Sequence, residues 1–256
     1  MVALPLLALI AAISLAVVPV HGLQNLFKPL SFGGGPMGAS PSTTSLEDQL
    51  VEAISNEGNR LANSDSVASL ISRLESQNPT NEPAISPLVY GRWRLLYTNN
   101  ADTSSPVQRS AVNAQKYTIY QDIIVNDNEQ LQVNQVVQFS DKIQLSVDAL
   151  ASTAAYPLAE LTERQSGTTL GLSVLGVSLV GEEAQPDPNR PNSRINFVFD
   201  EGNFDFGGDF RIPYPVPFRL PILRDAVKGW IDITYLSDRL RIAKGNKGTT
   251  FVLLKE

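Results

Sequence analysis

Two stretches of the chain repeat apolar residues at helical spacing. The first apolar face is formed by Leu46, Leu50, Val51 and Ile54, and the second by Val67, Leu70, Ile71 and Leu74. Residues three and four apart share one side of a helix, so this pattern predicts two helices whose apolar faces pack on a core. We expect Thr44 and Glu47 to form a capping box on the first helix. Pro79 should stop the second.

Most of the remaining chain alternates apolar and polar residues as strands do. Leu145, Val147 and Ala149 are separated by single polar residues, and a period of two places them on one face of a sheet. The predicted strands are residues 91–98, 116–125, 130–139, 142–149, 194–200, 203–210 and 229–236. Short strands separated by turn signals are typical of an antiparallel barrel or sandwich.

Two segments interrupt this alternation. Residues 167–181 are uncharged, apolar and rich in glycine, and residues 207–225 place Pro213, Pro215, Pro217 and Pro221 beside aromatic residues. Prolines at that density exclude a central strand. Long ordered loops in compact domains are often functional, so we expect both segments at the rim of the fold.

The C-terminal segment, residues 229–255, is the most specific part of the sequence. Two strand-like runs flank a Gly-Asn-Lys-Gly turn that begins at Gly245, which predicts a hairpin. Together with Gly91-Arg92-Trp93, this segment resembles the plastid lipid-associated protein family, also called fibrillins. That family opens its domain with a Gly-x-Trp strand and closes it with Gly-Trp, Thr-Tyr-Leu, Leu-Arg-Ile, Gly-Asn-Lys-Gly and Phe-Val-Leu elements.

The resemblance covers residues 46–255, so we expect one family domain at residues 46–256. Two positions depart from the family pattern. Ser237 stands where the family usually has an acidic residue, and Lys244 stands where arginine is common.

The Gly-x-Trp strand is also similar to the opening strand of lipocalins, which are antiparallel barrels that carry apolar ligands. In that architecture a tryptophan closes one end of the barrel, and an arginine from a late strand packs across it. We therefore expect a lipocalin-like barrel preceded by the helical pair, closed by Gly91, Trp93 and Arg241. Arg239 is the second candidate for the arginine. Cation–π attraction favours such a contact.

A barrel of about eight strands is wide enough to hold one small ligand. The inward candidates are Leu145, Val147, Ile195, Phe197 and Phe199, which either bind an apolar ligand or simply fill the interior. The resemblance implies a non-enzymatic plastid protein that binds or coats carotenoids, prenylquinones or fatty acids at thylakoids or plastoglobules. Leu172, Val174, Tyr214 and Phe218 are the candidates for lipid-surface contact, unless their segments fold back as a cap over the core.

Two other functions stay open on the sequence alone. A lipocalin-like enzyme would need an inward polar cluster, for which the sequence offers Asp148, Glu160 or Asp232 with Tyr117 or Tyr120. A scaffold protein would contact its partner through the proline-rich loop. The residues of the enzyme hypothesis have no constrained spacing.

Composition excludes several kinds of site. Cysteine is absent and the only histidine is His21, so Cys/His zinc sites and Ser-His-Asp or Cys-His nucleophiles are ruled out for a mature chain that lacks the leader. We expect no metal and no other cofactor. The net charge is −6 without a basic stripe, which argues against a nucleic-acid partner. A peripheral membrane contact would have to be apolar rather than electrostatic.

The first 45 residues have the composition of a targeting leader. Residues 1–20 carry no charged side chain, and Val20-His21-Gly22 fits a cleavage site. Residues 1–22 are therefore predicted to be a signal peptide, with an uncleaved membrane anchor as the alternative. Residues 23–45 are a transit-like or linker segment without acidic residues. Together they predict a two-part leader that reaches the plastid through the secretory pathway.

Overall fold

The computed structural model describes residues 43–56, 65–99, 117–157, 186–207, 210–213, 228–245 and 248–256. Two helices, α2 (Thr43–Asn56) and α3 (Asp65–Ser76), precede two short 3-10 helices, η1 (Pro83–Ile85) and η2 (Pro87–Val89). The strands that follow are β1 (Gly91–Thr98), β2 (Thr118–Val125), β3 (Leu131–Ser140), β4 (Ile143–Ser152), β5 (Arg194–Asp205), β6 (Arg211–Pro213), β7 (Lys228–Leu236), β8 (Leu240–Gly245) and β9 (Thr250–Lys255).

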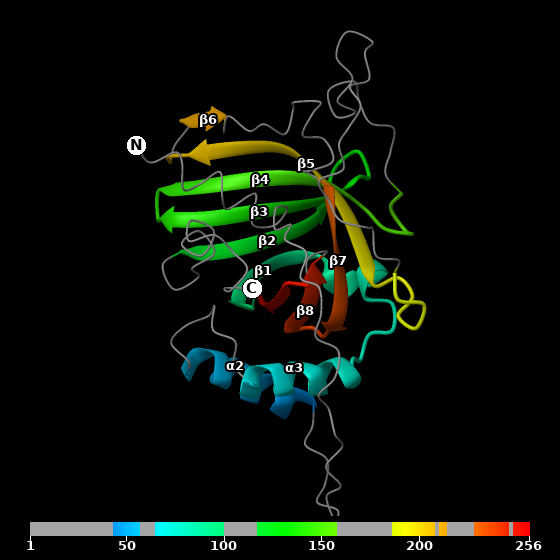
Figure 1. Ribbon diagram of the computed structural model, residues 1–256. Helices are drawn as coiled ribbons and strands as arrows, with labels where there is room; N and C mark the ends of the chain where they lie inside the picture. The colour runs from blue at the N-terminus through cyan, green and yellow to red at the C-terminus, as the bar shows by residue number, and fades with distance from the viewer. Residues whose placement is uncertain are drawn as a thin grey trace, which may run out of the picture.

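Eight of these strands form a closed antiparallel barrel. Neighbouring strands follow the order β4-β3-β2-β1-β9-β8-β7-β5, and a pairing between β4 and β5 closes the ring (Figure 1). The short strand β6 pairs with the last residues of β5. This arrangement confirms the mainly β, lipocalin-like barrel with two helices before it.

Strand β5 is one continuous strand where the sequence predicted two. Its register against β4 shifts between Asp148, which faces Glu201, and Ala149, which faces Phe199. Asp200 is therefore the extra residue of a β-bulge, which interrupts the alternation without ending the strand. The prediction of two strands at 194–200 and 203–210 was wrong for this reason.

The C-terminal region is a three-stranded meander rather than a single hairpin. Strands β8 and β9 flank the Gly-Asn-Lys-Gly turn as expected. The first run, however, is divided into β7 and β8 by a tight turn in which the Ser237 backbone N–H donates to the Leu240 carbonyl at 2.9 Å. The apolar residues on both sides of this turn concealed it in the sequence.

The predicted capping box at the start of α2 stays a prediction, because the Thr44 side chain lies outside the described residues. Helix α2 includes both Thr43 and Thr44. The Glu47 side chain accepts a hydrogen bond from the Tyr235 hydroxyl at 2.7 Å.

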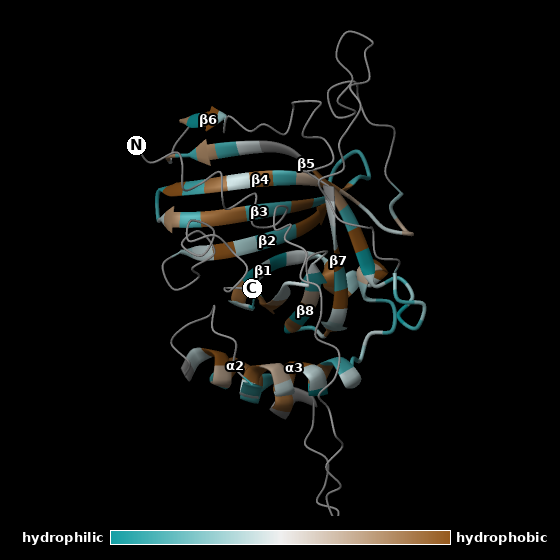
Figure 2. Ribbon diagram, viewed as in Figure 1, coloured by the Kyte–Doolittle hydropathy of each residue, from teal (hydrophilic) through white to brown (hydrophobic). Residues whose placement is uncertain are grey.

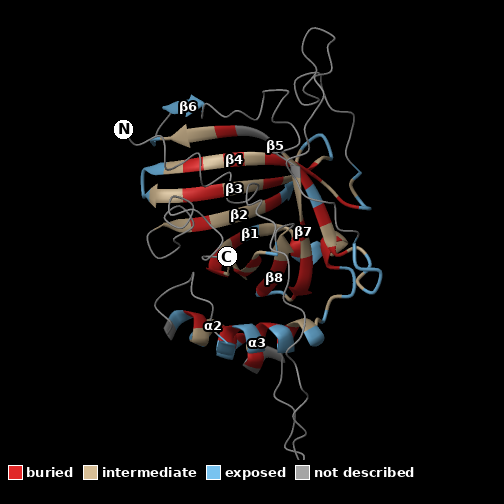
Figure 3. Cartoon of the chain, viewed as in Figure 1, coloured by how far each residue is buried: buried red, intermediate tan, exposed pale blue. Residues whose placement is uncertain are grey.

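The barrel wall has a packed cluster on each side. The inner cluster lies on the inside of the barrel wall and includes Trp93, Val133, Leu145 and Ile233. The outer cluster joins the apolar faces of α2 and α3 to residues of β1, β7, β8 and β9 that point away from the barrel. Figure 2 shows apolar and polar residues alternating along the strands, and Figure 3 shows buried residues concentrated on β7, β8 and parts of the two helices. The predicted apolar helix faces thus contact the outside of the barrel.

The strand register also defines two ends of the barrel. The end where β1 begins at Gly91 is covered by η1 and η2, whose Ala84 and Val89 belong to the inner cluster. We call this the closed end. The opposite end, where β1 ends and β4 begins, is called the loop end. No helix among the described residues is long and apolar enough to cross a membrane.

Candidate functional site

Trp93 anchors the closed end of the barrel interior. Its side chain is fully buried, and its indole N–H donates to the Val89 carbonyl at 2.8 Å. Pro83 and Pro87 lie at the first positions of η1 and η2, where their fixed backbone torsion favours a short helical turn. The chain then turns into β1 through Gly91, whose φ is +114°. Residues with a side chain rarely adopt that conformation.

Arg241 lies against Trp93 inside the barrel. The guanidinium carbon is 4.9 Å from the Trp93 ring centroid, so the contact expected for Arg241 rather than Arg239 is present. One terminal nitrogen of Arg241 donates to the side-chain carbonyl of Gln121. The Arg241 side chain is fully buried, and burial lowers the pKa of its guanidinium to about 9.

Lys255 provides a second cation at the same tryptophan. Its ammonium nitrogen lies 4.5 Å from the Trp93 ring centroid and donates to the carbonyls of Leu88 and Tyr90. Burial, and then the charge of Arg241, lower the pKa of Lys255. The closed end therefore combines one aromatic ring with two cations.

The predicted interior residues lie on the inner wall as far as they are described. Leu145, Val147, Ile195 and Phe197 are buried members of the inner cluster, whereas the side chain of Phe199 lies outside the described residues. Ile119, Val137, Leu145 and Phe204 oppose one another on successive strands and form one inward row. The next row toward the closed end is Gln121, Gln135 and Val147. The following row, Ile123, Val133 and Ala149, is apolar again. The interior is thus apolar on both sides of one partly polar row that lies level with Trp93.

Gly229 leaves room for the ring of Phe197, because it has no side chain. The two residues are paired across β5 and β7, and a Cβ atom on Gly229 would lie 2.6 Å from the Phe197 ring. A separation below 3 Å is too short for carbon atoms at van der Waals contact. The family's Gly-Trp element therefore includes a glycine that makes room for an inward ring, a role that sequence reasoning missed.

The residues predicted for lipid-surface contact, Leu172, Val174, Tyr214 and Phe218, lie outside the described residues. The strands that flank them are described. Strand β4 ends and β5 begins at the closed end, whereas β7 begins at the loop end. The expected rim position of residues 167–181 and 207–225 stays a prediction, because most of these residues lie outside the described part of the chain.

Exposed apolar side chains gather at the loop end, and two of them, Phe210 and Ile212, belong to the proline-rich segment, residues 207–225. Phe206, Phe210, Ile212 and Ile143 all have at least 36% of their surface exposed, with Phe210 at 61%. The ring centroids of Phe206 and Phe210 are 5.8 Å apart. Phe206, Phe210 and Ile212 lie near the β5–β6 pairing and form a small apolar surface.

Asp232 and Tyr117, two candidates of the enzyme hypothesis, lie apart. Asp232 forms an ion pair with Arg194 at 2.6 Å, and Arg194 stacks on Trp230 at 3.7 Å. Tyr117 packs on Phe139 against the inner cluster, so these two candidates belong to different faces of the wall. Glu160 lies outside the described residues. Among the described residues, no group of three side chains is placed to bind a metal ion.

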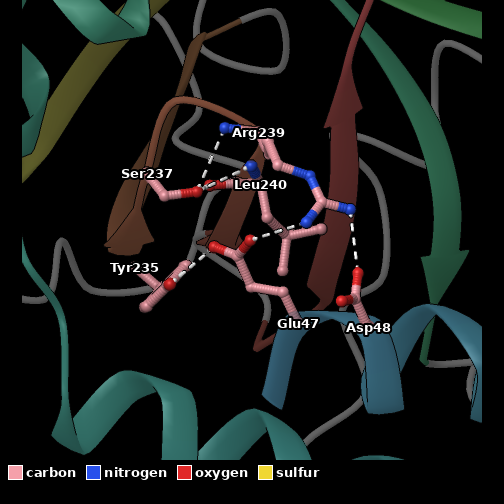
Figure 4. Close-up of polar contacts among 6 residues, drawn as sticks. All are labelled: Glu47, Asp48, Tyr235, Ser237, Arg239 and Leu240. Carbon is pink, nitrogen blue, oxygen red and sulfur yellow. Dashed lines mark hydrogen bonds and ion pairs between the residues drawn. The ribbon is translucent and has the colours of Figure 1, made fainter. Parts of the chain in front are cut away.

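A polar network fastens α2 to the outside of the barrel (Figure 4). Glu47 accepts from the Tyr235 hydroxyl at 2.7 Å, and Arg239 donates to Asp48 at 3.0 Å. Arg239 also lies 3.8 Å from Glu47. Burial and then the hydrogen bond to Glu47 raise the pKa of Tyr235. The only sequence signal for this network was an acidic residue beside the apolar face of α2.

Both departures from the family pattern have structural roles. The Ser237 hydroxyl oxygen accepts from the backbone N–H groups of Arg239 at 3.1 Å and Leu240 at 2.9 Å, so it forms the turn between β7 and β8. Lys244 forms an ion pair with Glu75 of α3 at 2.8 Å. A lysine at this position thus still connects the barrel to a helix.

A closed eight-stranded antiparallel barrel with a tryptophan and an arginine at its covered end defines a lipocalin-like protein. Residues 44–254 match the PAP_fibrillin family model. The chain belongs to this family, whose members include the plastid lipid-associated proteins.

Curated relatives agree with this assignment. The chain is 37% identical over 194 residues to probable plastid-lipid-associated protein 12 of Arabidopsis thaliana, covering 74% of this chain and 38% of that relative. It is 30% identical over 201 residues to the chromoplast-specific carotenoid-associated protein of Cucumis sativus, covering 74% of this chain and 60% of the relative. The chain thus spans less than two thirds of either relative. No solved structure gave a significant match.

Proposed function

We propose that this protein is a non-enzymatic lipid-associated protein of the plastid that holds an apolar lipid inside its barrel. The observation that carries the proposal is the inner row of Ile119, Val137, Leu145 and Phe204, which gives the loop end of the interior an apolar lining. Burying apolar ligand surface against such a lining contributes about 25 cal/mol per Å². Relatives named as plastid-lipid-associated and carotenoid-associated proteins support the ligand class.

The surface of the protein has a second role in this proposal. Phe206, Phe210 and Ile212 are exposed at the loop end, and a net charge of −6 leaves apolar contact as the route to a lipid surface. Leu172, Val174, Tyr214 and Phe218 remain proposed surface contacts. A thylakoid or plastoglobule is the surface we propose.

The route to the plastid follows from the leader. Residues 1–22 act as a signal peptide and residues 23–45 as a transit segment in this proposal. The names of relatives, which are chloroplastic or chromoplastic, support the destination. A fluorescent fusion of residues 1–45 tests the route: we expect it to pass through the secretory system to the plastid, and a shortened fusion would distinguish a cleaved signal peptide from an uncleaved anchor.

The experiment that tests the binding role is mass spectrometry of lipids that co-purify with the full chain from plastid-containing cells. We expect one or a few apolar lipids at a stoichiometry near one per chain. The control is the same chain with Val137→Asp and Leu145→Asp, which places charges in the inner row. A wild-type protein that carries no lipid and that binds none when plastid lipids are added would disprove the internal binding role.

A further inference from the structure

Residues 83–90 form a cap over the closed end of the barrel. The cap consists of η1, η2 and the residues that adjoin them. Among the residues that the structure describes, one backbone hydrogen bond joins the cap to a distant part of the chain, from the Ala84 N–H to the Asn192 carbonyl at 2.8 Å. The strands of the barrel are instead held by backbone pairing with neighbours on both sides. The cap is therefore attached to the barrel mainly by side chains.

Two side chains of the barrel hold three consecutive carbonyl groups of the cap. The Trp93 indole N–H donates to the Val89 carbonyl at 2.8 Å. The Lys255 ammonium donates to the carbonyls on either side of it, to that of Leu88 at 2.9 Å and to that of Tyr90. Trp93 is fully buried, whereas Lys255 lies at the end of β9 and is only partly buried. Lys255 therefore makes two of the three contacts, and it makes them from the surface.

The cap itself contributes few buried side chains. Pro83, Ala84 and Val89 are buried, whereas Leu88 is 40% exposed. The hydrogen bond that closes η1, from the Ser86 N–H to the Pro83 carbonyl, is 3.4 Å long, in keeping with the poorer bond geometry of 3-10 helices. Segments with few buried apolar contacts open at a lower free energy than the domain as a whole. The cap has the properties of such a segment.

Fixed positions border the cap on both sides. On the N-terminal side, Asn78 accepts from the Leu236 backbone N–H at 2.9 Å, and the Thr80 hydroxyl donates to the Leu236 carbonyl at 2.7 Å. Residues 78–80 are thereby held to β7. On the C-terminal side, Gly91 begins β1 with a φ of +114°, which favours glycine. Hinge motions are absorbed by a few residues at the ends of elements, and Gly91 is such a residue.

Lys255 lies directly against this hinge. A Cβ atom on Gly91 would be 3.3 Å from both the Cε and the Nζ atoms of Lys255. Burial, and then the charge of Arg241, lower the pKa of Lys255, so the ammonium holds the cap from a position that a second cation disfavours. Its acceptors are backbone carbonyls and not a carboxylate. Such a contact is weaker than an ion pair and can be released.

We propose that residues 83–90 open as a unit about Gly91, with Lys255 as the latch, while the barrel stays folded. Opening releases the carbonyls that Lys255 and Trp93 hold, and it exposes the buried Trp93 ring to solvent. The closed end then becomes a second place, besides the loop end, where the inside of the barrel meets solvent. This opening does not require a bound lipid, so it stands apart from the proposed function.

Hydrogen–deuterium exchange of the full-length chain, followed by mass spectrometry, measures the opening. In the wild-type protein, amides of residues 83–90 should be protected at least about tenfold less than those of β3, and low concentrations of urea should barely change their exchange, because local opening exposes little surface. Lys255→Met should accelerate exchange of the cap about three- to tenfold, as expected for the loss of two partly exposed hydrogen bonds. Exchange of β3 should not change.

Lys244→Met is the matched control. This substitution removes the same charge from the neighbouring strand β8, but Lys244 is paired with Glu75 of α3 on the outside of the barrel. Exchange of the cap in this variant should equal that of the wild-type protein.

Three results would overturn the proposal. Exchange of the cap with the same protection and urea dependence as β3 would mean that the cap opens only when the whole domain unfolds. Unchanged exchange in Lys255→Met would show that Lys255 is not the latch. Equal acceleration of the cap and β3, or equal acceleration by Lys244→Met, would indicate a general loss of stability. Since no lipid enters the experiment, these results leave the proposed lipid binding untouched.

Discussion

Two arginines, Arg239 and Arg241, lie two residues apart and experience opposite environments. Arg239 faces helix α2 on the outside of the barrel, where Asp48 and Glu47 lie 3.0 Å and 3.8 Å from it. Arg241 points into the barrel, where its one described acceptor is the amide of Gln121. The first is partly solvated and paired with acids, and the second is fully buried without one.

This difference separates two tasks of the barrel wall. On the outer face, the Tyr235 hydroxyl, Arg239 and Lys244 each meet an acidic partner from a helix. Such an interface holds α2 and α3 in place. The inner face keeps a cation whose donors are unsatisfied, which is a poor arrangement for stability alone. The two faces thus differ in how completely their polar side chains are paired.

The largest expected effect belongs to the residue that both inner cations contact. Trp93→Ala should lower the free energy of unfolding by about 3–5 kcal/mol, the range for removing a buried aromatic side chain. The variant also loses the indole bond to Val89 that fastens η2. Urea denaturation followed by far-ultraviolet circular dichroism measures the effect. A loss below about 1 kcal/mol would mean that Trp93 is not central to the inner face.

Breaking the outer network should have the next largest effect. Glu47→Ala leaves the buried Tyr235 hydroxyl without its acceptor, and an unsatisfied buried polar group costs about 1–3 kcal/mol. Glu47→Gln is the matched control, because its side-chain carbonyl can still accept from Tyr235 and should recover much of the loss. Equal destabilisation by both variants would show that the charge near Arg239, and not the bond to Tyr235, matters.

The two faces were predictable from the sequence to different degrees. The inward alternation of Leu145 and Val147 and the apolar helix faces could be read because period two and period 3.6 are local properties. The side on which an arginine lies could not be read from Arg239 and Arg241 alone. They are an even number of residues apart, and alternation would place both on the same face.

The two arginines lie on different sides of the wall because Arg239 precedes β8, which begins at Leu240. A turn residue does not follow the alternation of the strand. The bulge at Asp200 was missed because it depends on pairing with β4, which is distant in sequence. The division between β7 and β8 was missed because apolar residues flank the tight turn at Ser237. The Glu47–Tyr235 bond joins residues 188 positions apart, which no local pattern reveals.

The outer network should also make the fold sensitive to alkali. The pKa of Tyr235 is raised in the folded state, whereas the unfolded tyrosine releases its proton near the ordinary value of about 10. The stabilising contribution is therefore complete below pH 10 and is lost as the pH rises above it, by at most about 1.4 kcal/mol per pH unit. Tyr235→Phe should flatten the fall in urea midpoint between pH 9 and pH 11. If the urea midpoint of Tyr235→Phe fell as steeply with pH as that of the wild-type protein, other groups would cause the loss of stability.

Replacing each arginine in turn compares the two faces directly in protein freed of lipid. Arg241→Met should change the free energy of unfolding by less than about 1 kcal/mol or even raise it, because the lost contact with Trp93 is offset by relief of burying a charge. Arg239→Met should lower it by about 0.2–1 kcal/mol, as is usual for exposed ion pairs. A large loss in Arg241→Met alone would show that the buried charge and its contact with Trp93 stabilise the fold.

The smallest expected effect concerns Ser237, where the chain departs from its family. The Ser237 hydroxyl oxygen accepts from two backbone N–H groups in the turn before β8, and an aspartate carboxylate can accept the same two bonds. Ser237→Asp should therefore keep the turn. It should stabilise the protein by at most about 0.5 kcal/mol, since Arg239 is partly exposed and a charge added near it is screened by solvent.

Ser237→Ala is the control, because it removes the acceptor and should cost about 0.5–1.5 kcal/mol. Thermal unfolding of both variants and of the wild-type protein measures the order of their stabilities. If Ser237→Asp were as destabilising as Ser237→Ala, the hydroxyl would be needed as the donor that the structure places 3.4 Å from the Leu240 carbonyl. In that case the outer face would differ from the family in its chemistry, and not only in the residue that forms the turn.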